Sequence, residues 1–489
     1  MNFLFSNLFS VSAMLPSNPR IVIVGGGVSG IAAAVSLVDK GFDNVTVLEA
    51  EDRLGGRVNT VPFGHSHVDL GAHWVHGEEG NAVFEIGNQL GLLTSSGDFG
   101  NIEFLADDGT EISSYVGMSL YEASCAILDD KEEMKKAKGS VENYLTPRIS
   151  AIASEQIPDK RLLDAYLDWL MKFECTIEGC DYLSDPSAPG LSHYKQCPGD
   201  PITCWIRGGY KNIVDILLNE HPAALGKVNP LEGKILLNTE VKEIDWSGLT
   251  AFVKTKDGRS FQADHVIVTV SLGVLKDRHS SLFNPRLPDK KIQAIRGLGI
   301  GTVNKIYLKF EKAWWPEGCC GFSLLRKNKS APLEVGEYPW ERDIIGFYIE
   351  STAPMVLGAW LVGDAARDME TYKDEQVLAA CYRTLIKFAG TKYDIPPPEA
   401  VIRSKWFSNP HFRGSYSYRS ISSDVLNTSA AHLAEPVKNF YKKEMLFFAG
   451  EATHSYFYST VHGALETGWR EATRIAAMYK SKKLSKCSL

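Results

Sequence analysis

The chain has 489 residues, of which 44% are hydrophobic and 23% are charged, and its formal net charge at pH 7 is -7. Its length exceeds what one hydrophobic core supports and, with this composition, indicates a soluble globular protein of two to four domains. The acidic balance argues against nucleic acid as a partner and is compatible with a cationic small molecule. No apolar run reaches the ~20 residues of a membrane span.

Residues 20–58 carry the most informative pattern. The apolar run from Arg20 to Val24 predicts a buried strand, and Gly25, Gly27 and Gly30 then supply G-x-G-x-x-G before a helix that starts near Ser29. A tight turn, a close approach of the backbone to a pyrophosphate and close helix–strand packing need these three glycines, in that order. The next expected strand ends in Glu49, which is placed to bind a ribose hydroxyl. The order of these pieces predicts that the chain binds FAD or NAD. The acid disfavours NADP, because NADP carries a 2′-phosphate.

Two further segments extend this prediction. LGGRV follows Glu49 and offers Arg57 as a bidentate partner for the same pyrophosphate, with a solvated arginine in a surface turn as the alternative. HSHVD and GAHWVHG place four histidines within twelve residues, and His65, His67 and Asp69 would share one face of a strand. These three side chains do not form a closed ligand set, so we expect no metal here.

The chain resembles the flavin-dependent amine oxidases almost from end to end. The motifs that carry the resemblance, besides the glycine-rich segment, are EAEDRLGGRV, DLGAHWVHG, GTVNKIYLKF, LGAWLVGDAA, SNPHFRGSYSY and FFAGEATHSYFYSTVHGALETGWREA. The resemblance implies a discontinuous α/β Rossmann-like FAD-binding domain and an α+β substrate-binding domain. We expect the first in residues 17–90, 225–290 and 405–478 and the second in residues 91–224 and 291–404. Residues 1–16 form an N-terminal extension or a signal peptide, and residues 479–489 form a basic tail.

The resemblance also implies which residues meet noncovalently bound FAD. Ser415 stands where monoamine oxidases carry the cysteine that bonds to the flavin. Glu451 would contact the ribityl chain at the tip of a strand, and Val241 would hold the adenine with its backbone, although a plain strand valine is the alternative. Trp406 is expected mainly to pack in the core, and His73 to pack or bond locally. The expected cofactor-binding residues are Gly25, Gly27, Gly30, Glu49, Arg57, Gly71, Ala72, His73, Trp74, Val241, Trp406, Glu451, Thr460 and Val461.

Four residues are expected at the reaction itself. Lys305 lies in an alternating strand where a solvated lysine would be ordinary, but in the family the matching lysine holds a water against flavin N5, the hydride acceptor. Tyr416 matches one wall of an aromatic cage around the amine. Thr460 replaces the second cage tyrosine of monoamine oxidases, as in animal polyamine oxidases. His76 matches an active-site histidine of those enzymes and would bond or tune a substrate nitrogen.

These features predict a polyamine oxidase that acts on spermine, spermidine or their acetylated forms, with O₂ as acceptor. A carboxylate should bind the distal ammonium, although Glu174, Glu178, Asp181 and Asp185 could equally be a charged loop. The alternatives are another flavin amine oxidase, including a histone-demethylase-like one, an L-amino acid oxidase that uses Arg403 or Arg413, and a noncatalytic FAD-binding protein. The oligomeric state is left open.

The compartment is also left open by the two ends and the cysteines. Residues 1–15 contain a short apolar run without a basic start, and the chain ends in SKCSL, which only loosely resembles a peroxisomal signal. Cys175, Cys180, Cys197 and Cys204 lie in one stretch, and we expect disulfides among them if the chain is exported. Their spacing fits no standard zinc site. A cytoplasmic or secreted protein is favoured over a peroxisomal one.

Overall fold

The computed structural model describes residue 16 and residues 18–96 and 100–486, with side-chain surroundings up to residue 480. Of the segment expected as an extension or signal peptide, only Pro16 is described. The last three residues of SKCSL also lie outside the described residues.

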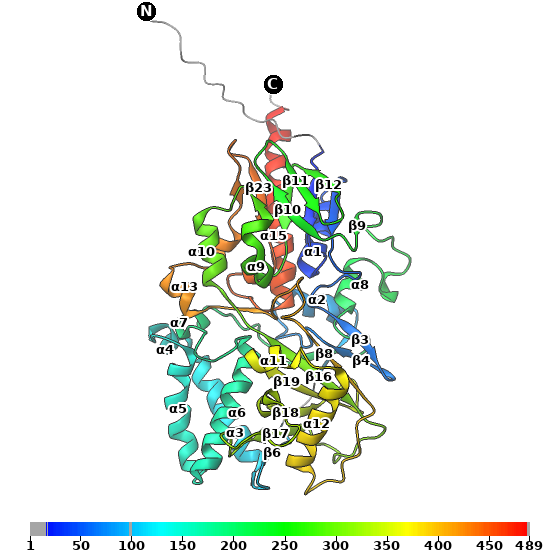
Figure 1. The fold of residues 1–489 in the computed structure, drawn as a ribbon. Coiled ribbons are helices and arrows are strands. Elements are labelled where there is room, and N and C mark those ends of the chain that lie inside the picture. The colour runs from blue at the N-terminus through cyan, green and yellow to red at the C-terminus, as the bar shows by residue number, and fades with distance from the viewer. Residues whose placement is uncertain (1–15, 17, 97–99, 487–489) are drawn as a thin grey trace, which may run out of the picture.

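A six-stranded sheet forms the centre of the upper half of the molecule (Figure 1). Its strands stand in the order β22 (Val437–Lys438), β23 (Glu444–Phe448), β13 (His265–Val268), β1 (Ile21–Val24), β2 (Val45–Leu48) and β9 (Ile235–Leu236). All neighbours are parallel except β22, which is antiparallel to β23. Because the parallel strands end at one edge, the residues after β1, β2, β13 and β23 meet there.

Two layers cover this sheet. On one face lie α1 (Val28–Asp39) and α15 (Val461–Lys486), side by side in Figure 1. A Cβ at Gly468 would lie 2.3 Å from the carbonyl oxygen of Ser29, so glycine allows the two helices to touch. The other face packs on a four-stranded sheet of β12 (Ser260–Ala263), β11 (Ala251–Thr255), β10 (Val241–Asp245) and β14 (Phe283–Asn284), with α9 (Leu272–Leu282) and α10 (Asp289–Gly297) beside it.

A seven-stranded sheet organises the lower half (Figure 1). Its order is β20 (Ala400–Arg403), β16 (Val303–Lys309), β19 (Val356–Val362), β18 (Gly346–Ile349), β17 (Gly321–Leu325), β6 (Ile102–Ala106) and β7 (Glu111–Ile112). Phe104 and Leu105 point to opposite faces and join different cores. One core contains α3 (Ser114–Asp129), α5 (Val141–Gln156) and α6 (Lys160–Glu178), and the other contains α11 (Gly363–Met369) and α12 (Asp374–Ala389).

Short elements lie between and around the two large sheets. Three strand pairs are β3 (Thr60–Phe63) with β4 (Ser66–Asp69), β5 (Leu93–Ser95) with β8 (Thr203–Trp205), and β15 (Gly299–Ile300) with β21 (Ser417–Tyr418). The short helices are α2 (Ala82–Gln89), α4 (Lys131–Lys136), α7 (Ala188–Leu191), α8 (Asn212–Leu217), α13 (Ile421–Val425) and α14 (Ala430–Ala434). Three 3-10 turns span Pro222–Ala224, Pro339–Asp343 and Glu451–Thr453.

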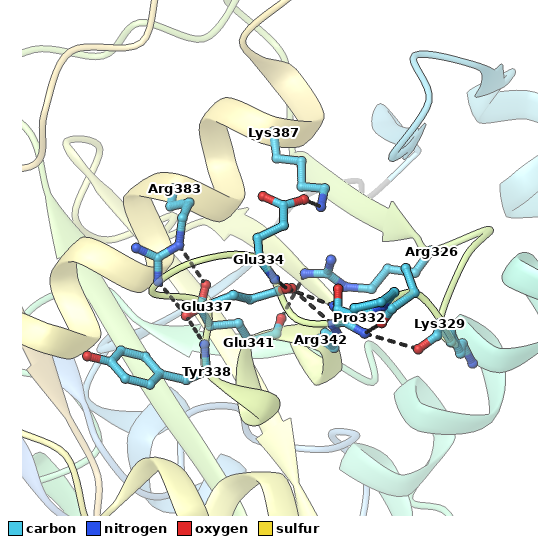
Figure 2. A network of polar contacts seen from close by, with 11 residues as sticks. Arg326, Lys329, Pro332, Glu334, Glu337, Tyr338, Glu341, Arg342, Arg383 and Lys387 are labelled. Carbon is cyan, nitrogen blue, oxygen red and sulfur yellow. Dashed lines mark hydrogen bonds and ion pairs between the residues drawn. The ribbon is translucent and has the colours of Figure 1, made fainter.

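The loop from β17 to β18 is closed by charged side chains (Figure 2). Arg342 binds both oxygens of Glu337, at 3.0 Å and 2.8 Å, and donates to the carbonyl oxygens of Lys329 and Pro332 at 3.1 Å and 2.8 Å. Arg383, on α12, reaches the buried carboxylate of Glu341. These bonds hold in place a loop that contains no strand.

The predicted α/β fold with a second, mixed domain is confirmed. The six-stranded sheet draws its strands from residues 21–48, 235–268 and 437–448. Tyr210, Ile213 and Val214 pack in the same core as α1, although the expected boundary at residue 225 assigns them to the substrate-binding domain. We therefore propose that this boundary lies near Trp205.

Candidate active site

The three glycines after β1 have the geometry that their expected roles require. Gly25 has φ +114°, and a Cβ there would lie 2.5 Å from Oγ1 of Thr269. A Cβ at Gly30 would lie 2.0 Å from the carbonyl oxygen of Gly25, so the helix can begin this close to the strand only with glycine. A Cβ at Gly27 would meet no atom nearer than 3.9 Å, so this side of the loop is open to a bound group.

Glu49 lies directly after β2 and binds the backbone of the glycine-rich loop. Its carboxylate accepts hydrogen bonds from the backbone N–H of Gly26 at 2.6 Å and of Glu51 at 2.8 Å. Burial raises its pKa in spite of these two donors. The carboxylate therefore shapes the loop, and a bond to a ribose would add to this role.

Arg57 and the buried carboxylate of Glu451 form an ion pair at the strand ends. Nη1 of Arg57 lies 2.9 Å from Oε1 of Glu451 and donates to the carbonyl oxygen of Ser415 at 2.7 Å. Ser417 and the N–H of Ser459 donate to the other oxygen of Glu451, at 2.6 Å and 2.8 Å. Burial acts to raise the pKa of Glu451, but Arg57 and these donors outweigh it and the pKa is lowered. Arg57 and Glu451 line the same cleft, and a charged, extended ligand can lie across the edge of the sheet there.

Lys305 is a buried cation in the middle of β16, and the solvated-lysine alternative is wrong. Its Nζ donates to the carbonyl oxygens of Asp69 and Gly71, at 2.9 Å and 2.8 Å. Tyr307 lies on the same face of the strand and donates its hydroxyl to the carbonyl of Asp69 at 3.0 Å. Burial lowers the pKa of Lys305 to about 8, against the opposing effect of Asp69 and Glu350.

His73 forms an ion pair with a carboxylate from a distant part of the sequence. Its Nε2 lies 3.1 Å from Oε1 of Glu350, and both side chains are buried. Burial acts to lower the pKa of His73, but Glu350 outweighs it and raises the pKa to about 9. Trp74 stacks on the imidazole, with centroids 4.4 Å apart, and its ring lies 6.0 Å from Nζ of Lys305. His73, Trp74 and Lys305 thus form one continuous polar and aromatic unit.

The backbone at Gly71 lies in close contact with Arg57 and Trp406. A Cβ there would lie 1.8 Å from the carbonyl oxygen of Arg57 and 3.2 Å from the ring of Trp406. The N–H of Ala72 donates to the same carbonyl at 3.1 Å. Trp406 is buried, donates to the carbonyl of Leu70 at 3.2 Å and therefore acts as a packing residue, as expected.

His76 faces a different environment from His73. Its side chain has exposed surface, and desolvation lowers its pKa. Its Nδ1 lies 2.9 Å from the carbonyl oxygen of Pro201. Because a carbonyl can only accept, Nδ1 carries the proton and the neutral ring keeps Nε2 as a free acceptor.

Tyr416 packs on the end of α6. Its hydroxyl donates to the carbonyl oxygen of Thr176, and a Cβ at Gly179 would lie 2.3 Å from Cδ2 of its ring. Glu178 lies beside this tyrosine and contributes to raising its pKa. Among the described residues Glu178 has no hydrogen bond or ion pair with another side chain or the backbone. Burial raises its pKa to about 7.

The other three carboxylates of this stretch have local roles. Glu174 is buried with Oγ of Ser124 at 3.5 Å, and burial raises its pKa to about 8. Asp181 accepts from the N–H of Thr302 at 2.8 Å and pairs with Arg367, and Asp185 accepts from the N–H of Tyr182 at 3.3 Å. Glu178 is therefore the carboxylate of the four that remains available to a ligand.

Three further residues of the expected cofactor-binding set lie where a helix or a strand begins, namely Thr460, Val461 and Val241. Thr460 caps α15, because its Oγ1 accepts from the N–H of Gly463 at 3.0 Å and donates to the carbonyl of Phe457 at 2.7 Å. The helix begins at Val461. Val241 begins β10 and is buried against the main sheet.

The comparisons decide the family. The sequence model described as flavin containing amine oxidoreductase matches residues 28–476. The chain belongs to this family.

The similarity to known proteins extends over nearly the full chain. The human peroxisomal N(1)-acetyl-spermine/spermidine oxidase is 32% identical over 95% of this chain and 96% of its own length, and the bovine protein of the same name is 32% identical over 94% and 95%. A probable polyamine oxidase 5 of Arabidopsis thaliana is 30% identical over 94% of this chain and 98% of its own length. A solved putrescine oxidase variant covers 94% of this chain at 19% identity with a TM-score of 0.67, which shows the shared fold.

Membership makes the protein a flavin-dependent amine oxidase with FAD as cofactor. The open side of Gly27, the cleft of Arg57 and Glu451 and the absence of a thiol at Ser415 all fit a noncovalently bound dinucleotide. The Ser415 hydroxyl is itself engaged in bonds to the backbone of Val303. We propose that Gly27, Arg57 and Glu451 contact FAD.

Two further features of this amine oxidase are its cysteines and its possible metal ligands. Cys175, Cys180, Cys197 and Cys204 are free thiols, so the disulfides expected for an exported chain are not formed. Within the described part of the chain, no group of three or more His, Cys, Asp or Glu residues could hold a metal ion. No helix there is long and apolar enough to span a membrane.

The sequence analysis missed Glu350, the ion-pair partner of His73. Glu350 follows the buried strand β18 directly, as Glu49 follows β2. A carboxylate at the end of an apolar strand was therefore the available signal. This signal could not identify His73 as the partner, because the two residues are 277 positions apart in the chain and meet only in the folded protein.

Proposed function

We propose that the protein is a polyamine oxidase. It oxidises the carbon next to a secondary amine of spermine, spermidine or their acetylated forms, and the imine is hydrolysed to an aldehyde and a shorter amine while O₂ becomes hydrogen peroxide. The observation that carries the proposal is Glu178, an unpaired carboxylate beside the Tyr416 ring. The names of the human, bovine and Arabidopsis relatives support it.

A long cation fits this arrangement for a simple reason. The aromatic face of Tyr416 attracts a polarised amine, and Glu178 offers a negative charge close by for a second, distal ammonium. Tyr194 and Tyr458 also lie near Glu178, since the carboxylate contributes to raising the pKa of both hydroxyls. A monoamine would leave this carboxylate without a partner.

The residues around the reacting carbon position protons and exclude water. When bound, FAD supplies the hydride acceptor and passes the electrons to O₂. Lys305 holds its ammonium at the 69–71 backbone, where it can bind a water and favour negative charge nearby. His76 keeps its Nε2 as an acceptor for a substrate N–H, which favours an oriented and unprotonated amine at the reacting carbon.

The structure weakens the L-amino acid oxidase alternative. Arg403 is buried in a bond to Asp374 at 2.8 Å and in bonds to backbone carbonyls, and Arg413 pairs with Asp277 at 3.4 Å. The guanidinium of Arg403 is therefore not free for a substrate carboxylate, and that of Arg413 lies partly exposed beside Asp277. The rice lysine-specific histone demethylase 1 homolog 2 is 30% identical over 96% of this chain, but the chain covers only 59% of that protein.

The test is flavin reduction without oxygen. Purified holoenzyme is mixed anaerobically with spermine, N1-acetylspermine, a monoamine and an L-amino acid, and the flavin absorbance is followed. We expect bleaching by a polyamine. If no amine bleaches the flavin, the oxidase proposal fails, and bleaching by the amino acid alone would replace the polyamine by an amino acid as substrate.

Lys305→Met is the matched variant in the same experiment. The protein should stay yellow, because FAD is held elsewhere, while flavin reduction or reoxidation slows strongly. Wild-type rates in both half-reactions would contradict the role proposed for Lys305.

A further inference from the structure

The turn between β22 and β23 presents two aromatic side chains to solvent. Phe440 is 88% exposed and Tyr441 is 46% exposed, and their rings meet edge to face with centroids 5.7 Å apart. The turn itself is well held, because the buried side chain of Asn439 accepts from the N–H of Lys443 at 3.0 Å and donates to the carbonyl oxygen of Gly248 at 2.8 Å. The two rings therefore project from a fixed support, and large apolar side chains gathered on a surface in this way mark a site of interaction.

A third apolar side chain lies beside this turn. Leu249, in the turn between β10 and β11, is 47% exposed, and its carbonyl oxygen accepts from Nζ of Lys443 at 3.2 Å. Lys442 is exposed next to Tyr441, whereas only 9% of the Lys443 side chain is exposed. We call this the hairpin surface, formed by Phe440, Tyr441, Lys442 and Leu249.

The chain enters and leaves the fold next to the hairpin surface. Arg20, just before β1, and Lys443 share the buried carboxylate of Asp264, at 3.0 Å and 3.6 Å. Near the end of α15, the hydroxyl of Tyr479 lies 2.8 Å from Nε2 of His265, whose Nδ1 lies 2.9 Å from the carbonyl oxygen of the first residue of β23. The start of β1 and the end of α15 thus lie together at the upper end of the molecule, opposite the seven-stranded sheet (Figure 1).

The sequences that continue from these two points are apolar on one side and basic on the other. Residues 1–19 contain no charged side chain, and residues 1–15 include three phenylalanines and three leucines. Residues 480–489 contain four lysines and no acidic residue. Because the whole chain has a net charge of -7, an anionic surface repels most of the molecule and attracts this end.

We propose that the hairpin surface docks on an anionic lipid membrane, with the rings of Phe440 and Tyr441 and the side chain of Leu249 in the interfacial layer and the lysines of residues 480–489 against the headgroups. Aromatic side chains favour the boundary between headgroups and acyl chains, and lysines near an anionic leaflet are attracted to it. Such docking needs no helix that spans the membrane. It concerns where the molecule is held and does not rest on the proposed function.

Charge favours a membrane over the other possible occupants of this surface. A second copy related by a two-fold axis would bring two lysine-rich segments together, which like charges oppose. Residues 1–15 of the same chain could cover the rings, but they carry no acid to bind the lysines. An anionic membrane offers both an apolar layer and negative charge.

Co-sedimentation of the FAD-loaded protein with vesicles tests the proposal. Vesicles of phosphatidylcholine alone are compared with vesicles of phosphatidylcholine and phosphatidylserine. We expect binding to the mixed vesicles to be tighter by about tenfold or more and to weaken as salt is added. No binding to the mixed vesicles, or equal binding to both kinds, would overturn the proposal.

The variants separate the hairpin surface from the rest of the molecule. The double variant Phe440→Ser/Tyr441→Ser should weaken binding to the mixed vesicles by about tenfold or more, because it removes the aromatic side chains that enter the interface. Its rate of amine oxidation in solution should stay that of the wild type. Tyr115→Ser is the matched control, since Tyr115 is 82% exposed on α3 in the lower half, and it should bind as the wild type does.

The lysine is tested in the same way. Lys442→Glu should weaken binding, whereas Lys135→Glu, at an exposed position of α4, should not. Binding as in the wild type by both the double variant and Lys442→Glu would overturn the proposal.

Two further measurements identify another occupant if there is one. Removal of residues 1–15 should weaken vesicle binding, and tighter binding after removal would show that this segment covers the hairpin surface. Sedimentation velocity should give the same molecular mass for the wild type and the double variant. A wild-type dimer that dissociates in the double variant would assign the surface to a second copy and overturn the proposal.

Discussion

At the scale of single residues, the candidate site is built from charges that the fold either pairs or leaves open. His73 and Lys305 are both buried cations, yet their pKa values move in opposite directions, to about 9 and about 8. The difference is that His73 has a carboxylate at 3.1 Å while Lys305 binds backbone carbonyls. Glu178 is the reverse case. This carboxylate has no hydrogen bond or ion pair among the described residues, and the charge of Lys131, which forms no ion pair with it, only partly opposes the effect of burial on its pKa, so a cationic substrate gains most here.

Glu178→Gln should raise KM for a polyamine and leave kcat at saturation nearly unchanged. Loss of one charge-assisted hydrogen bond, worth roughly 1.5–3 kcal/mol, corresponds to a factor of about 10–100 in KM. The pKa of Glu178 is raised to about 7, so its carboxylate forms as pH rises through that value. KM of the wild type should therefore fall as pH rises through about 7, and this component should vanish in the variant.

Asp164→Asn is the control for this change, because Asp164 lies on the same helix and is exposed. It should leave KM and its pH profile as in the wild type. If Glu178→Gln also has a wild-type KM for every polyamine, the distal ammonium binds elsewhere.

At the scale of elements, the segments that the sequence predicted best are local ones. The β1–α1–β2 unit could be read from its apolar run, its glycines and its terminal acid, since each signal lies within a few residues of its effect. The parallel pairing of β6 with β17 joins residues 102–106 to 321–325 and has no local signal. The same holds for the ion pair of His73 and Glu350, which are 277 positions apart in the chain.

The loop between β17 and β18 offers a test of stability at this scale. Glu337 has its pKa lowered to about 2, chiefly by its hydrogen bonds to Arg342. A carboxyl with a depressed folded-state pKa stabilises fully above its unfolded pKa of about 4.5 and loses this contribution as pH falls towards 2. Arg342→Ala should therefore lower the free energy of unfolding at pH 7 by about 1–3 kcal/mol and have a smaller effect near pH 3.

Thermal or denaturant unfolding of wild type and variant at both pH values measures this difference. Arg286→Ala removes a pair in which both side chains are more than two-thirds exposed, at 71% and 79%, and serves as the matched control with little effect. An Arg342→Ala effect that is the same at pH 7 and pH 3 would contradict the assignment to Glu337.

At the scale of the whole molecule, the part that we propose to bind FAD is built around one sheet whose strands come from three stretches of chain. Gly27, Glu49 and Arg57 come from the first stretch, Val241 from the second, and Ser415 and Glu451 from the third. The Arg57–Glu451 pair already joins the first and third stretches. A dinucleotide that spans the same edge would bind the folded assembly and not the unfolded chain, so its binding adds directly to stability.

Apoprotein should therefore gain thermal stability from FAD in a way that depends on Arg57. A ligand at 100 times its Kd adds about 2.7 kcal/mol, which corresponds to a rise in Tm of roughly 5–10 °C for a domain of this size. FMN, which lacks the adenylate half and the pyrophosphate, should give a much smaller rise. Arg57→Ala should reduce the response to FAD, because it removes both the cation at the cleft and the partner of Glu451. Melting curves of the apoproteins over a range of FAD and FMN concentrations test this, and an equal response to both ligands would mean that the strand-end cleft does not hold the dinucleotide.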